Sequence, residues 1–189
     1  MSKNLNAFSN FIYSSDHGKT WNVAASGTPK GITSNENQIV QLRDGSLMMN
    51  MRSSYSANRD VHSIGRAISV TRDMGRTWTE HPTSGKALPE PGCCAGLLAH
   101  GDLLVFSNPP NPKWAGNRTR MTLKFSRDDG KSWPEEYHLL LDSGKSAYSC
   151  LTSVDDETIG ILYEGSRARI CFQKVKVDTL PLVREKRAK

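Results

Sequence analysis

Ser126-Arg127-Asp128-Asp129-Gly130-Lys131-Ser132-Trp133 is the clearest copy of an eight-residue phrase that occurs three times in this 189-residue chain. The other copies span residues 14–21 and 71–78, and all three fit the pattern Ser/Thr-x-Asp-x-Gly-x-Ser/Thr-Trp. Their aspartates, at positions 16, 73 and 128, are 57 and 55 residues apart. A repeat with this period predicts an array of similar structural units, such as the blades of a propeller.

The residue types of the phrase predict the corner of a β-hairpin. The aspartate can accept backbone N–H bonds across a turn, the glycine tolerates a positive φ, and the hydroxyl side chains bond to the nearby backbone. The tryptophan is expected to begin the next strand and to bury its ring between repeats. The residues given this structural role are Asp16, Gly18, Trp21, Asp73, Gly75, Trp78, Asp128, Gly130 and Trp133. The phrase resembles the Asp-box (BNR repeat) of sialidases and of several non-enzymatic propellers, so alone it indicates architecture rather than activity.

Composition restricts the possible partners. The chain is 37% hydrophobic and 7% aromatic, which is typical of a domain with short strands and polar turns, and no apolar run is long enough for a membrane span. The net charge of +6 would suit an anionic ligand, but basic and aromatic residues do not alternate as in nucleic-acid platforms, so no nucleic acid is expected. The basic segment 178–189 is expected to be a solvated tail. The four cysteines and five histidines show no metal-ligand spacing, and we expect neither a metal nor another cofactor.

The apolar pattern predicts short antiparallel strands and no segment with a helical period. Two tight turns, Asp44-Gly45 and Gly101-Asp102, separate apolar strands. The strands fall into a partial blade in residues 1–30, blades in 31–85 and 86–141, and a last blade in 142–177. A single blade cannot cover its own faces. The sequence therefore predicts an all-β, incomplete propeller of about three blades, with further blades upstream of Met1.

Segments between the boxes carry a more specific resemblance. Residues 36–40, 44–52, 148–151 and 157–164 are similar to the second half of the bacterial exo-α-sialidases, or neuraminidases, which are glycoside hydrolases. The likeness covers roughly residues 8–177. It implies a six-bladed β-propeller of which this chain is the C-terminal half, and sialylated glycans as substrates. It also implies secreted, periplasmic or cell-surface relatives, although the first residues here lack the apolar core of a secretory signal.

The same resemblance implies roles for five residues. Tyr148 resembles the family's nucleophile and Glu36 the carboxylate paired with it. Arg52 and Arg118 resemble the second and third arginines that clamp the substrate carboxylate, and Glu164 resembles the acid that holds the first arginine. Arg120, two residues after Arg118, is a rival for the third arginine because alternate strand residues share a face.

The chemistry of the substrate agrees with this set. Sialic acid carries a carboxylate on its anomeric carbon, which a neutral phenol approaches without the repulsion that an anionic nucleophile would meet. A phenol of pKa about 10 needs a neighbouring base. The first arginine and the aspartate acid of the family have no counterpart in this chain, so alone it is expected to have little activity. Two alternatives stay open: a non-catalytic Asp-box propeller that binds a glycan or a protein, and a basic nucleic-acid module, which only the charge supports.

Overall fold

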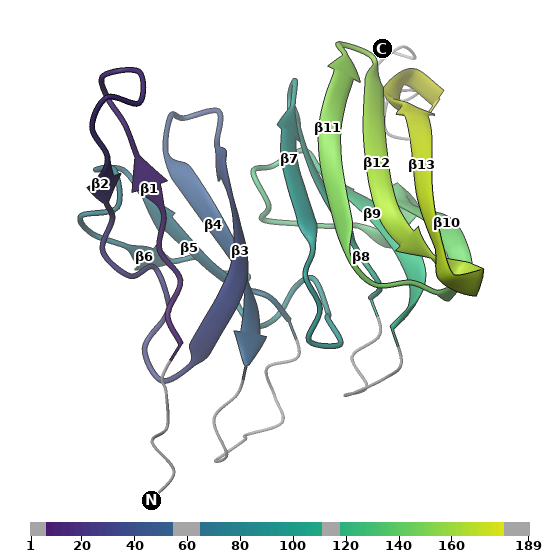
Figure 1. The fold of residues 1–189 in the computed structure, drawn as a ribbon, viewed down its shortest axis with the longest axis horizontal. Helices are drawn as coiled ribbons and strands as arrows, with labels where there is room; N and C mark the ends of the chain where they lie inside the picture. Colours follow the sequence, from purple (N-terminus) through teal and green to yellow (C-terminus); the bar gives the residue numbers. More distant parts are fainter. Residues whose placement is uncertain (1–6, 55–64, 111–117, 180–189) are drawn as a thin grey trace, which may run out of the picture.

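The computed structural model of the chain describes residues 7–54, 65–110 and 118–179. Apart from three short 3-10 turns, the regular structure in these ranges is β-strand, so the expected all-β class is confirmed. No helix in this part of the chain is long and apolar enough to cross a membrane. Four antiparallel sheets follow one another along the sequence (Figure 1).

Each sheet consists of consecutive strands joined by hairpins or short loops. The first has two strands, β1 (Ile12–Tyr13) and β2 (Asn22–Val23), and the second has four, β3 (Thr33–Gln41), β4 (Leu47–Ser54), β5 (Ala67–Thr71) and β6 (Thr79–Glu80). The third sheet also has four, β7 (Gly96–His100), β8 (Leu103–Asn108), β9 (Thr119–Ser126) and β10 (His138–Lys145). The fourth has three, β11 (Ser149–Asp155), β12 (Thr158–Gly165) and β13 (Arg169–Lys176). The 3-10 turns are η1 (Glu135–Tyr137), η2 (Ser166–Ala168) and η3 (Val177–Thr179).

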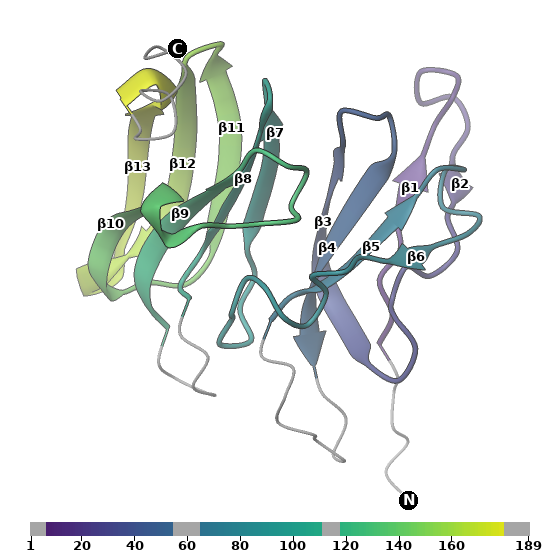
Figure 2. The ribbon, with the colours of Figure 1, turned by 180° about the vertical axis from the view of Figure 1, so that it is seen from behind.

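The first strands of the three larger sheets lie next to one another. Strand β7 contacts β3 on one side and β11 on the other, and both views show the sheets in this order (Figures 1 and 2). Such an arrangement, with one strand of each sheet near a common axis, is that of propeller blades. It brings the ends of β3 and β11 together although they are far apart in the sequence.

Apolar residues fill the spaces between neighbouring sheets. In β8, Leu104 and Phe106 pack into a core with the β3–β6 sheet, whereas Leu103 and Val105 pack into a second core with the β11–β13 sheet. All six residues of β8 are buried for this reason. A central blade is covered on both faces, so its strands are continuous apolar runs. A sheet with one face in solvent would instead show alternating apolar and polar residues.

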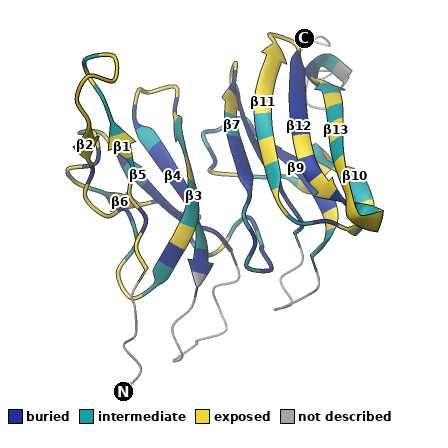
Figure 3. Ribbon diagram, viewed as in Figure 1, coloured by how far each residue is buried: buried dark blue, intermediate teal, exposed yellow. Residues whose placement is uncertain are grey.

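The two end sheets each leave an apolar face uncovered, and exposed residues gather on β1, β2, β11 and β13 (Figure 3). At one end Trp21 is 60% and Val23 70% exposed, and at the other Ile170 is 70% and Phe172 55% exposed. The described residues therefore form a stack of sheets and not a closed ring.

The three boxes fold in the same way, as their sequence predicts. In the second box, the carboxylate of Asp73 accepts the Thr77 N–H at 2.9 Å and the hydroxyl groups of Thr77 and Thr71 at 2.6 and 2.8 Å. The Thr71 hydroxyl oxygen in turn accepts the Gly75 N–H at 2.9 Å. The first and third boxes repeat all four bonds.

The box glycines also touch the preceding sheet. A Cβ at Gly75 would lie 2.5 Å from the Cβ of Ala24, and one at Gly130 would lie 3.1 Å from the Cε of Met48. The box loops thus pack each sheet on the one before it. The expectation that every box tryptophan is buried between repeats is wrong for Trp21, because no sheet of the described residues precedes β1, and Trp78 and Trp133 are half-buried against the preceding sheet.

Candidate active site

A hydrogen bond between two distant residues defines the site. The Tyr148 hydroxyl donates to Glu36 Oε1 at 2.8 Å, across 112 positions of sequence. Tyr148 directly precedes β11 and Glu36 lies within β3, and the two side chains meet although β7 lies between these strands. Tyr148 is 40% exposed, so the paired phenol remains accessible to a ligand.

The electrostatics of this pair are those of a phenol and a base. The bond to Glu36 raises the pKa of Tyr148, with smaller contributions from burial and from the Glu36 charge. Burial alone would raise the pKa of Glu36, but hydrogen bonds from Arg52 and Tyr148 outweigh it and lower that pKa. At neutral pH Glu36 is therefore an ionised carboxylate, and it accepts a hydrogen bond from the neutral phenol of Tyr148.

Two arginines flank the pair. Arg52, in β4, binds Glu36 Oε2 through its terminal NH1 at 2.6 Å, and its side chain is 23% exposed. Arg118 directly precedes β9, donates from NH2 to the Gly92 carbonyl at 2.7 Å, and lies 5.7 Å from the centroid of the Tyr148 ring. Both guanidinium groups therefore lie next to the exposed phenol, where they could receive an anionic ligand.

The backbone places Arg118 and Arg120 differently. Arg120 has a φ of 70°, and the pairing of β9 with β10 is irregular at this position. The alternation that would have placed the two arginines on one face is therefore broken. Arg120 is exposed, whereas Arg118 lies beside the Tyr148 ring.

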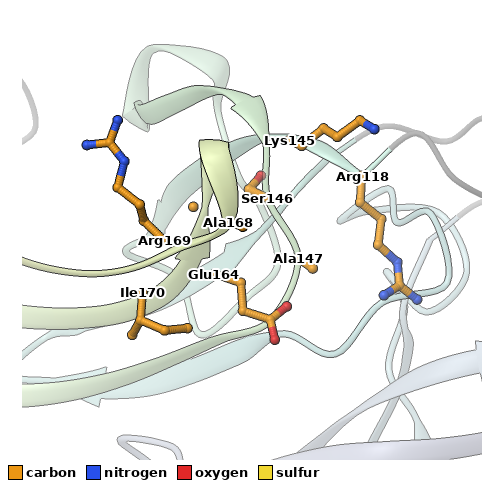
Figure 4. Close-up of a pocket in the computed structure, with 9 residues that line it drawn as sticks. Arg118, Lys145, Ser146, Ala147, Glu164, Ala168, Arg169 and Ile170 are labelled. Atoms are coloured by element: carbon orange, nitrogen blue, oxygen red, sulfur yellow. The ribbon is translucent and has the colours of Figure 1, made fainter.

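Glu164 is the fifth expected residue, and it lies at the end of β12 beside Tyr148. Its Oε2 accepts the Tyr148 backbone N–H at 3.1 Å, and its own N–H donates to the Tyr148 carbonyl at 2.9 Å. Glu164 and Arg118 line a pocket of about 510 Å³. Their side chains extend to the same side of it, whereas that of Arg169 extends away (Figure 4).

Sequence reasoning missed a buried layer beneath these residues. Arg66 is fully buried and binds Glu90 Oε2 at 2.6 Å through NH1. One feature of the sequence could have indicated Arg66. It directly precedes the third strand of its sheet, as Arg118 does in the next sheet. Its bonds to Glu36 and to the loop that holds Arg118 are visible only in the folded chain.

The arrangement combines an accessible phenol, a carboxylate bonded to it and two guanidinium groups beside the pair. Among the described residues, no group of three or more histidine, cysteine or carboxylate side chains could hold a metal ion. An exposed phenol bonded to a carboxylate can act as a nucleophile, and guanidinium groups beside it can bind a carboxylate.

Comparison with known proteins agrees with this architecture. Residues 4–162 match the model of the BNR repeat-like domain, and the chain belongs to this family of β-propeller repeats. Within it, the chain is similar to sialidases: it is 42% identical to one from Bacteroides fragilis and 32% identical to one from Micromonospora viridifaciens, over 89% and 81% of its length.

Solved structures of sialidases have a similar fold. A Hadza microbial sialidase, 42% identical, superposes with a TM-score of 0.76 over 89% of this chain, and the Ruminococcus gnavus intramolecular trans-sialidase, 25% identical, with 0.68 over 93%. The expected sialidase-type propeller, incomplete in this chain, is thereby confirmed. The chain spans 30% and 23% of the two curated relatives and 32% of the Hadza enzyme.

Proposed function

We propose that this chain contributes the nucleophile and two carboxylate-binding arginines to an exo-α-sialidase, which removes terminal sialic acid from glycans. The observation that carries the proposal is the 2.8 Å bond from the exposed Tyr148 hydroxyl to Glu36, with Arg52 and Arg118 on either side. The similarity to sialidases over most of the chain supports the same substrate class.

Two displacements at the anomeric carbon make up the reaction. The arginines hold the sugar carboxylate, and Tyr148 Oη attacks the anomeric carbon while its proton passes to Glu36. The bond from this carbon to the leaving oxygen breaks, and that oxygen takes a proton from an acid outside this chain. Water then attacks the same carbon and gives a proton to the outside group that protonated the leaving oxygen, while the Tyr148 oxygen leaves and recovers its proton from Glu36. Two displacements at one carbon retain its configuration.

The rest of the site belongs to sequence outside this chain. The family acid and first arginine are expected there, because the relatives are about three times longer. The uncovered faces at Val23 and Phe172 are where further blades would pack. For the 189-residue chain alone we expect no turnover, since protonation of the leaving group is worth about 10²–10⁴-fold.

The test measures hydrolysis of an aryl sialoside by the protein in its full natural length. We expect Tyr148→Phe to lower kcat/KM by about 10²–10⁴-fold, because the nucleophilic oxygen is removed. Tyr13→Phe is the matched control, because Tyr13 lies in β1 at the far end of the stack and makes no bond to Glu36. Turnover that survives Tyr148→Phe would contradict the proposal. Sialoside binding without any turnover would instead support the non-catalytic propeller.

A further inference from the structure

The backbone of Glu36 has an unusual conformation. Its φ is 39°, and it is the extra residue of a β-bulge, because Asn35 pairs with Arg52 and Asn37 with the adjacent Met51. A non-glycine residue in the left-handed region is disfavoured and persists only where its surroundings hold it. Bulges of this kind redirect a side chain at a strand. Here the redirected group is the carboxylate that accepts the Tyr148 proton.

Arg66 holds this bulge from below. Its NH2 donates to the Glu36 backbone carbonyl at 3.3 Å, its Nε to Asn50 Oδ1 at 2.7 Å, and its NH1 to Glu90 Oε2 at 2.6 Å. NH1 also donates to the Cys93 carbonyl at 2.9 Å. The guanidinium thus links four points of three separate segments, which the planar fork of arginine can do and the single ammonium of lysine cannot.

The main chain of Arg66 is fixed as well. Its N–H donates to the Leu88 carbonyl at 3.2 Å, and its carbonyl accepts the Gly85 N–H at 2.8 Å. Glu90, the counter-ion, accepts the Ser53 N–H at 2.9 Å through its other oxygen. Both partners of the buried pair are therefore anchored, so the position of the guanidinium is determined by the fold and not by the ligand.

The loop that receives Arg66 also receives an arginine of the site. Cys93 accepts from Arg66, and the preceding Gly92 accepts from Arg118 at 2.7 Å. Gly92 has a φ of 67°, and a Cβ there would lie 3.8 Å from the Arg52 NH2. One short loop therefore binds Arg66 and Arg118 directly and lies beside Arg52.

We propose that Arg66, held by Glu90, is the positioning residue of the base: it stabilises the left-handed Glu36 backbone and thereby aims the carboxylate at Tyr148. The proposal rests on the proposed function, in which Glu36 takes the Tyr148 proton. Arg66 touches no substrate and acts only through Glu36. Because a buried ion pair adds little net stability over apolar residues of similar size, the geometry it imposes is the stronger reason for its presence.

The test follows the ionisation of Tyr148 in the chain itself, without substrate. Tyrosine carrying ¹³C at Cζ is titrated by NMR, with Tyr148→Phe to assign the signal. Glu36→Gln removes the carboxylate charge from Tyr148 and gives the reference, and the pKa of Tyr148 is expected to fall in this variant by about half a pH unit or more. Arg66→Met combined with Glu90→Gln removes both buried charges together, so that neither is left unpaired, and we expect most of the same fall.

Two further variants complete the set. Lys124→Met is the matched control, because Lys124 is also a buried basic side chain against the Phe106 ring, 5.2 Å from its centroid, but makes no bond to Glu36; its Tyr148 titration should equal that of the wild type. Arg66→Lys keeps the charge and loses the fork. It should also lower the pKa of Tyr148. If the double variant does not fold, this single variant tests whether Arg66 positions Glu36.

The outcomes separate the two proposals. If Glu36→Gln lowers the pKa of Tyr148 while the folded Arg66 variants leave it at the wild-type value, the positioning role is wrong and the proposed function stands. If Glu36→Gln itself leaves the titration unchanged, the bond on which the proposed function rests is absent. A fall of equal size in Lys124→Met would show that the loss of any buried basic side chain suffices, which also overturns the role of Arg66.

Discussion

Two buried cations lie against one phenyl ring behind the candidate site. The guanidinium carbon of Arg66 is 5.9 Å and the Lys124 ammonium 5.2 Å from the Phe106 centroid, and Lys124 also donates to Asn108 Oδ1. Arg66 has a carboxylate partner, Glu90, whereas the bond from Lys124 goes to a neutral amide. Burial lowers the pKa of Lys124 to about 7, repulsion by Arg66 adds to this, and attraction by Glu90 opposes it.

Lys124 should therefore make stability depend on pH. Between about pH 7 and its ordinary pKa of 10.5, the unfolded chain binds a proton on this side chain that the folded chain does not. The free energy of unfolding should rise with pH in this window, by at most about 1.4 kcal/mol per pH unit. Urea unfolding between pH 6.5 and 9.5 measures the slope, which Lys124→Met should reduce and the exposed Lys131→Met should keep. Equal slopes in wild type and Lys124→Met would contradict the assignment.

At the scale of the element, the boxes join each sheet to the one before it. The Trp78 indole N–H of the second box donates to the Ala25 carbonyl at 3.0 Å, and the Trp78 ring meets Phe11 edge-on at 5.9 Å. In the third box the Trp133 ring packs on Phe106 at 6.1 Å. The carboxylates are strong acceptors here: bonds from Thr77 and Thr71 lower the pKa of Asp73 to about 2. A box is thus a rigid local turn that presents a ring and a glycine to its neighbour.

The third box offers a test with an internal control. Asp128 accepts three hydrogen bonds from Ser126 and Ser132, whereas the adjacent Asp129 pairs with Arg43 at 3.0 Å on the surface. Asp128→Asn replaces one acceptor oxygen with a donor and should destabilise the chain by about 1–2 kcal/mol. Asp129→Asn removes only an exposed ion pair and should cost at most about 0.5 kcal/mol. Urea unfolding of both variants measures the difference, and equal losses would argue against the box as a structural unit.

At the scale of the whole molecule, the stack of sheets ends in apolar faces. Leu162 and Phe172 are paired across β12 and β13, and they are 47% and 55% exposed. Exposed apolar patches of this kind mark surfaces that associate. This agrees with a chain that spans 30% of a curated relative.

The isolated chain should consequently associate through its last sheet. We expect Leu162→Thr combined with Phe172→Thr to remain folded, because both side chains are exposed, and to sediment more nearly as a monomer than the wild type. Val154→Thr is the control, since Val154 is 41% exposed at the end of β11, next to a turn. A wild-type chain that stays monomeric at high concentration, and equally so in all variants, would contradict this prediction.

The sequence by itself determined the strands, the boxes and the repeat. Box bonds join residues at most four positions apart, such as Asp73 and Thr77, so residue types and spacing suffice to predict them. The one expectation about a box that reached beyond the repeat, the burial of Trp21, was wrong because it depended on a neighbouring sheet.

Only the tertiary structure decided how the site is assembled. Resemblance proposed Glu36 and Tyr148, but their contact spans 112 residues and depends on how three successive sheets pack, with β7 between β3 and β11. The different positions of Arg118 and Arg120 likewise follow from a local break in strand geometry, and the partners of Arg66 come from three segments. Hydrogen bonds between residues a few positions apart depend on local residue types and can be predicted from the sequence. The position of a charge in a site depends instead on the packing of strands that the sequence places far apart.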